Sequence, residues 1–153
     1  MSQRYEYFVE TMKRTTLFFL TLLISMLCIV GCCDCRKRSK LEKPLMGTEW
    51  QLVQIMAEDI AAEGNCYTIT FKNNGTIAGM GNCNVFSATF MTTSSRELKI
   101  SNLGATRKLC PDFETENKFF DMLEHVTHYE MDADHMLLLS NGTLVAILQA
   151  VTE

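Results

Sequence analysis

The sequence predicts a small, mainly β domain in which a closed or nearly closed antiparallel barrel packs against one α-helix. Two observations support this prediction. Apolar and polar residues alternate in several short segments, which is the spacing that places every second side chain on one face of a strand. One later segment instead repeats its apolar residues at helical spacing. A closed barrel would also leave no exposed sheet edge.

The strands are expected in short segments separated by turn signals. Trp50 and Leu52 are two residues apart in the first segment, at residues 49–55, and every second residue is apolar in the next, at residues 67–71. The Asn-Gly pairs at 74–75 and 141–142 each predict a tight hairpin, because both central residues of that turn must accept a positive φ. The other strands are expected at residues 76–77, 86–90, 98–100, 129–131, 136–139 and 144–148.

The single helix is expected near residues 111–127. Pro111 suits its first position, where a missing N–H costs nothing. Acidic residues that follow, Glu116 among them, favour the positive end of the helix dipole. The apolar residues at helical spacing predict a buried face made of Phe119, Phe120, Leu123 and Val126.

Length and composition exclude several classes of protein. The chain has 153 residues, of which 47% are hydrophobic, and a formal net charge of −4. This length fits one domain of roughly 100–200 residues and excludes a multidomain enzyme. The apolar share excludes a disordered chain, and the mild acidity disfavours binding of nucleic acid through a basic patch. The sequence holds no nucleophile elbow, zinc-protease or P-loop pattern, so we expect a non-catalytic protein without a cofactor.

The N-terminal residues have the plan of a secretory signal peptide. Lys13 and Arg14 precede an apolar run, and the uncharged stretch from Thr15 to Gly31 spans 17 residues. A transmembrane helix needs about 20 apolar residues, so this stretch is short for a permanent span. Met12 begins a cleaner signal sequence than Met1 and is the alternative start.

The end of the apolar run, Ile29-Val30-Gly31-Cys32, resembles the lipobox of bacterial lipoproteins. The resemblance implies cleavage before Cys32 and a diacylglycerol thioether on its sulfur. An uncleaved membrane anchor with incidental cysteines is the alternative. Two or three acyl chains hold a protein on a membrane durably, whereas one chain binds marginally. Cys33 does not match the aspartate associated with inner-membrane retention, so we expect the outer membrane.

These features divide the chain into a signal peptide at 1–31, a tether at 32–43 that begins with the lipidated cysteine, and a folded domain at 44–153. Between residues 33 and 43 the tether carries five basic residues against two acidic ones. It is either a solvated linker or a contact for anionic headgroups, worth about 1 kcal/mol per basic residue. The sequence leaves both interpretations open.

Two clusters admit a metal-site interpretation that we do not favour. His125 and His128 are three residues apart, but they lie at the expected end of the helix, where the dipole favours a cation. Cys32, Cys33 and Cys35 can bind a soft metal only if all three thiols are free, and lipidation consumes one. We therefore expect no metal site.

The folded domain resembles the META domain (HslJ-like) family in three motifs that occur in the right order. The segment at 47–50 (GTEW) resembles its opening, residues 79–86 its central G-x-x-G-C-N-x-F motif, and residues 106–111 its second cysteine motif. Residues 116–123 resemble the helix that follows. The resemblance covers residues 45–150, essentially the whole mature domain.

The resemblance implies a small β-barrel-like fold with one helix, in the bacterial envelope, and no agreed catalytic activity. Members of the family are linked to heat shock, drug tolerance and secretion. The two cysteine motifs imply a disulfide between Cys83 and Cys110, which an oxidising periplasm favours; two reduced, buried thiols are the alternative. Cys66 has no evident partner and is expected to be a small buried apolar residue.

The central motif at residues 79–84 has two interpretations. It is either a bulged crossing that needs glycine conformations, or part of a binding surface. In the second case Asn82, Asn84, Thr106 and Arg107 would cluster around the disulfide as a polar surface.

Together these features predict a membrane-anchored envelope lipoprotein with a non-catalytic META domain, which binds an envelope protein partner or supports stress tolerance. The alternative is a carrier of a small apolar ligand, because small antiparallel barrels can hold one ligand in their interior. Inward packing of four large side chains would close that interior and argue against a carrier. These side chains are Trp50, Phe71, Phe90 and Leu138.

Overall fold

The computed structural model describes residues 42–62, 64–109, 111 and 113–151. The signal peptide, the lipidation site at Cys32 and the predicted disulfide partner Cys110 lie outside these residues. Within the described ranges, no helix is long and apolar enough to cross a membrane.

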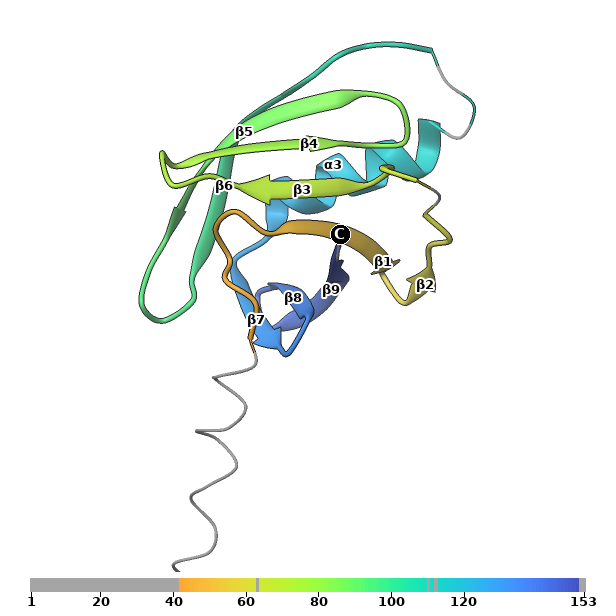
Figure 1. The fold of residues 1–153 in the computed structure, drawn as a ribbon. Helices are drawn as coiled ribbons and strands as arrows, with labels where there is room; N and C mark the ends of the chain where they lie inside the picture. The colour runs from red at the N-terminus through yellow and green to blue at the C-terminus, as the bar shows by residue number, and fades with distance from the viewer. Residues whose placement is uncertain (1–41, 63, 110, 112, 152–153) are drawn as a thin grey trace, which may run out of the picture. The chain divides into compact units, whose positions relative to one another are not determined.

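The described chain folds into one antiparallel sheet of nine strands and one helix (Figure 1), which confirms the mainly β class. The two-residue strand β2 pairs with the end of β1 and was not expected from the sequence. The elements are β1 Glu49–Ile55, β2 Glu58–Asp59, β3 Thr68–Phe71, β4 Thr76–Met80, β5 Val85–Thr92, β6 Leu98–Ala105, α3 Phe113–His125, β7 His128–Asp132, β8 His135–Ser140 and β9 Thr143–Ala150.

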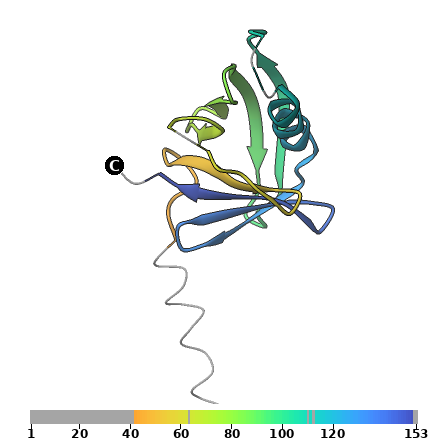
Figure 2. The ribbon, with the colours of Figure 1, turned by 90° about the vertical axis from the view of Figure 1, so that its right-hand side faces the viewer.

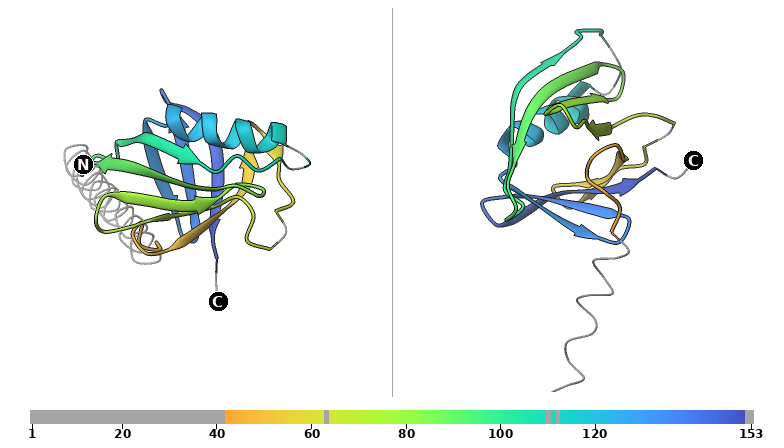
Figure 3. Two further views of the ribbon diagram at one scale, coloured as in Figure 1. Left: turned by 90° about the horizontal axis from the view of Figure 1, so that it is seen from above. Right: turned by 60° about the vertical axis from the view of Figure 1, so that its left-hand side comes forward.

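The sheet is strongly curved but is not closed into a barrel, so of the two expected forms, closed and nearly closed, full closure is not found. Its strand order is β6-β5-β4-β3-β1-β9-β8-β7, and β6 and β7 form its two ends. These ends meet at one corner, where Leu98 N donates to Thr127 O at 2.8 Å and Tyr129 N donates to Arg96 O at 3.0 Å. Figure 2 shows β4–β6 standing steeply against β7–β9. Helix α3 lies beside β6 in the opening that remains (Figure 3).

The two Asn-Gly pairs form different turns. Asn141 and Gly142 both have positive φ, 49° and 82°, so the tight β8–β9 hairpin is confirmed. Between β3 and β4 only Gly75 has a positive φ, and Lys72 N donates to Thr76 O at 2.8 Å across a longer loop. The hairpin expected at residues 74–75 is therefore confirmed, but its turn is not the two-residue type, because only one of the two residues adopts the left-handed conformation.

The helix is shorter than the predicted range. It begins at Phe113, and Pro111 lies in a turn before it, where the Pro111 carbonyl oxygen accepts a hydrogen bond from Asn82 Nδ2 at 3.1 Å. The helix ends at His125, and Val126 is buried just after it. The predicted face is confirmed at its buried positions, and Phe119 packs edge-on against the rings of Tyr67 and Phe86.

Large side chains fill the concave side of the sheet. Trp50, Phe71 and Leu138 are 0% exposed, and Phe90 is 7% exposed. Phe71 and Phe90 contact each other edge-on, with ring centroids 5.0 Å apart. This inward packing is the outcome that argues against an apolar-ligand carrier, because the space that such a ligand needs is occupied by side chains.

Candidate functional site

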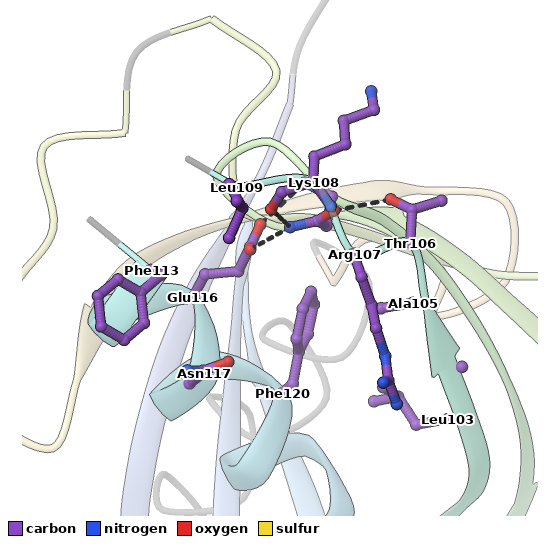
Figure 4. A pocket seen from close by; sticks show the side chains of 12 residues that line it. Leu103, Ala105, Thr106, Arg107, Lys108, Leu109, Phe113, Glu116, Asn117 and Phe120 are labelled. Atoms are coloured by element: carbon purple, nitrogen blue, oxygen red, sulfur yellow. Dashed lines mark hydrogen bonds between the residues drawn. The ribbon is translucent and has the colours of Figure 1, made fainter. Parts of the chain in front are cut away.

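Asn84 is the centre of a buried polar cluster that joins three segments of the chain (Figure 4). Its side-chain oxygen accepts hydrogen bonds from Thr106 Oγ1 at 2.8 Å and from Lys108 N at 2.7 Å. Its side-chain amide donates to Glu116 Oε2 at 2.6 Å and to the Lys108 carbonyl oxygen at 3.3 Å. Asn84 thereby ties the start of β5 to the chain after β6 and to α3.

Glu116 is the carboxylate that this cluster is built around. It is 3% exposed, and its Oε1 accepts hydrogen bonds from the backbone N–H groups of Cys83 and Asn84, both at 2.9 Å. Burial raises the pKa of Glu116, but the side-chain and backbone hydrogen bonds that it accepts outweigh burial and leave the pKa below its ordinary value. Glu116 is therefore ionised at neutral pH and has no proton to give as a general acid.

The glycines of the central motif are needed for space. Neither Gly79 nor Gly81 has a positive φ, and β4 pairs with β3 and β5 without a register shift. A Cβ at Gly79 would overlap the Thr68 carbonyl oxygen and the Phe86 ring, and one at Gly81 would overlap the Glu116 carboxylate. The expected bulged crossing with special glycine conformations is therefore wrong.

The structure brings together three of the four residues predicted as a binding surface. Asn84 and Thr106 are hydrogen-bonded to each other, and Asn82 reaches the Pro111 carbonyl oxygen from the same loop. Arg107 is exposed at the edge of the cluster. Asn84 is buried, so it supports this region from beneath and offers little surface of its own.

The two cysteine motifs are held side by side by the residues around the cysteines. Asn84 bonds to the backbone of Lys108, and Asn82 bonds to the Pro111 carbonyl oxygen. These contacts flank Cys83 on one segment and the position of Cys110 on the other. The Cys83–Cys110 disulfide itself stays a prediction, because Cys110 lies outside the described residues.

A groove of about 540 Å³ lies between the end of β6 and the start of α3. Figure 4 shows Phe120 pointing into it from the helix, Arg107 running along the β6 side, and Lys108 extending away. The lining residues include both apolar and polar side chains. They are Asn84, Leu103, Gly104, Ala105, Thr106, Arg107, Lys108, Leu109, Phe113, Glu116, Asn117 and Phe120.

Sequence reasoning assigned Glu116 to the helix dipole and missed its role in the cluster. A signal for that role was present in the sequence. Glu116 precedes Phe119, Phe120 and Leu123 by three, four and seven residues, which places it on the same helical face as these apolar side chains. A carboxylate on a buried face needs several hydrogen-bond donors.

Cys66 is a half-buried free thiol whose sulfur donates to the Asn82 carbonyl oxygen at 3.3 Å. Among the described residues, no group of three or more His, Cys, Asp or Glu side chains is arranged to hold a metal ion.

The described domain matches a known protein family. The META domain matches residues 43–152, which is most of the chain and includes both the polar cluster and the groove. The chain belongs to the META domain family. The Asn84–Glu116 cluster is thus a feature of a META domain. No curated protein matches the chain.

Solved structures support the same fold. An NMR structure of a protein from Burkholderia xenovorans is 22% identical with a TM-score of 0.55, and the match covers 71% of this chain and 85% of that one. A second NMR structure is 21% identical with a TM-score of 0.54, covering 67% and 87%. At these identities the likeness concerns the fold alone. A DUF4847 family protein from Bacteroides vulgatus ATCC 8482 is 28% identical with a TM-score of 0.43, over 54% of this chain and 57% of that protein.

Proposed function

We propose that this chain is a lipid-anchored lipoprotein of the bacterial envelope, whose META domain is a non-catalytic binding module that supports envelope stress tolerance. One observation carries the proposal for the domain. The polar groups of the site that could take part in chemistry, Asn84 and Glu116, are already engaged by hydrogen bonds within the protein. Through these hydrogen bonds the two side chains hold the surface around them in place.

The side chains around this braced cluster suit binding. Arg107 and Lys108 are exposed, and so are the apolar side chains of Leu109 and Phe113, at 104% and 66%. Exposed apolar side chains next to positive charge are typical of protein-interaction surfaces. A rigid support beneath such a surface reduces the ordering cost of binding.

The proposed location rests on the N-terminal sequence. A lipid on Cys32 would hold the domain on a membrane through the tether at 32–43. The outer membrane is the proposed site, and an envelope protein is the proposed partner.

The anchoring is tested by the intact mass of the protein from the membrane fraction. We expect a chain that starts at Cys32 and is heavier by a lipid moiety. Cys32→Ala should leave an unprocessed, unlipidated precursor, whereas Cys35→Ala is the matched control and should be processed normally. A full-length, unmodified wild-type chain would contradict the proposal.

The role is tested in the host cell after deletion of the gene. Wild-type protein and the Cys35→Ala control are expected to restore survival after heat or detergent challenge, and Cys32→Ala is not. Equal survival with and without the gene under both challenges would contradict a role in stress tolerance.

A further inference from the structure

The groove beside β6 borders an open sheet edge. Among the described strands, β6 pairs along its length with β5 alone, and only its first residues reach the β7 end of the sheet. Its second half, Ser101–Ala105, faces the groove through Leu103, Gly104 and Ala105. A strand edge of this kind offers a row of backbone hydrogen-bonding groups to another chain.

The direction of these backbone groups follows from one hydrogen bond. Thr106 N donates to Val85 O at 3.0 Å, so the N–H of Thr106 faces β5. Neighbouring residues of a strand point their backbone groups to opposite sides, so those of Gly104 also face β5. The backbone groups of Ala105 therefore face the groove. The alternation does not extend to Leu103, because the pairing of β6 with β5 shifts register between Gly104 and Ser101.

The other side of the groove is helix α3, which presents Phe120, Asn117 and Phe113. An extended chain laid between β6 and α3 would add one strand to the sheet. Its alternate side chains would point toward the half-buried ring of Phe120. This is the geometry of peptide recognition by strand addition, in which the backbone gives affinity and side-chain pockets give selectivity.

The charge of the groove indicates which peptides it would bind. Arg107 is an exposed cation that runs along the groove just after the C-terminal end of β6, whereas the side chain of Lys108 extends away from it. Among the described lining residues the one carboxylate, Glu116, is buried and already accepts hydrogen bonds from its own chain. The groove therefore presents positive charge to a ligand, which favours acidic side chains at this end.

We propose that this groove binds an extended, acidic segment of a partner protein. The segment adds to the sheet along Leu103–Ala105. It places apolar side chains against Phe120 and a carboxylate near Arg107. The inference rests on the proposed function as a binding module and names the chemistry of its partner.

Two other occupants fit less well. The chain's own tether carries five basic residues against two acidic ones between residues 33 and 43, so Arg107 would repel it. The β6 edge of a second copy, residues 101–107, carries no acidic residue, so it would leave Arg107 without a carboxylate partner.

The test is selection of short random peptides displayed on phage against the purified full chain in detergent. We expect enrichment of peptides in which Asp or Glu accompanies alternating apolar residues. Affinities of the enriched peptides are then measured by fluorescence anisotropy. Arg107→Glu should weaken binding by about tenfold or more, since it turns an attraction into a repulsion. Lys99→Glu, an exposed charge reversal at the other end of β6, is the matched control and should have little effect.

A second variant tests the backbone contact. Ala105→Pro removes an N–H that faces the groove, and an edge strand tolerates proline at such a position. Loss of that hydrogen bond should weaken binding by about tenfold. The amide of Ala105 should also exchange more slowly with deuterium when the peptide is bound.

Several results would overturn the inference: no enrichment of acidic peptides, equal binding by Arg107→Glu and wild type, or a dimer of the chain that occupies the β6 edge. Because the peptide test uses purified protein, it is independent of the lipid and survival tests. Failure here leaves the lipoprotein proposal standing, and failure of those tests leaves the peptide result standing.

Discussion

At the scale of single residues, Glu116 shows how hydrogen bonds keep a buried charge in place. A buried carboxylate is costly unless donors surround it, and Glu116 accepts from two backbone N–H groups and from the Asn84 side chain. In Glu116→Gln, the new amide would face the Asn84 amide, donor against donor. Asn84 cannot turn over, because its oxygen already accepts two hydrogen bonds. We expect a loss of about 2 kcal/mol in the free energy of unfolding at pH 7, measured by urea denaturation.

The difference in the free energy of unfolding between wild type and Glu116→Gln depends on pH in a predictable direction. The pKa of Glu116 is lower in the folded protein than its ordinary value, so ionisation stabilises the fold. That stabilisation is present above the ordinary pKa of glutamate and is lost as the pH falls through the lowered pKa. The difference in the free energy of unfolding between wild type and Glu116→Gln should therefore become smaller in acid. Glu114→Gln, exposed on the same helix, is the control and should change stability by about 0.5 kcal/mol or less. A gap that widens in acid would contradict this account.

Gly79 gives a second prediction at this scale. In Gly79→Ala, the added methyl group would overlap the Thr68 carbonyl oxygen, which is backbone and cannot move aside cheaply. We expect a loss of about 2–3 kcal/mol by urea denaturation. Gly104→Ala is the matched control, because its Cβ would meet no atom within 4 Å and its φ is not positive. Equal stability of the two variants would show that space at Gly79 is not limiting.

At the scale of elements, the segments around the central motif are joined by side chains of Asn82 and Asn84. Their contacts with Pro111 and Lys108 bring the two cysteine motifs together. A Cys83–Cys110 disulfide would close a loop of 28 residues, for which loop entropy predicts about 3–4 kcal/mol of stabilisation. Reductant should lower the stability of wild type by this amount and leave Cys83→Ser unchanged. Alkylation of both cysteines without reductant would rule the disulfide out.

Sequence patterns located the elements well and their ends less well. Alternation predicted β1 over its observed range, Glu49–Ile55, but gave β6 only its first three residues. The rest of β6 has Asn102 at a positive φ, and its pairing with β5 includes a register shift. A bulged strand with glycine near its end lacks the period-two signal on which the prediction depends.

At the scale of the whole molecule, closure of the sheet could not be predicted from alternation. Residues on the concave side are buried whether the two end strands pair fully or meet at one corner. The choice depends on how the β6 and β7 ends approach each other, and α3 lies across the groove from the second half of β6. The composition of the site was limited in the same way, because it depends on contacts between distant segments. The residue types of the central motif indicated a polar cluster, but they could not indicate its partner Glu116, which is 32 residues away from Asn84 in the chain.

The open edge gives a final prediction, which amide hydrogen exchange checks on the free protein. Backbone groups inside the sheet are paired, so amides of central β1, such as that of fully buried Leu52, should exchange slowly. Along the end of β6, protection should alternate. Thr106, bonded to Val85, should be protected, and Ala105, which faces the groove, should exchange quickly. In a closed barrel the amide of Ala105 would also be paired to a strand. Equal protection of Gly104, Ala105 and Thr106 would therefore show that the edge is covered in solution, and it would remove the site at which we propose that a peptide adds.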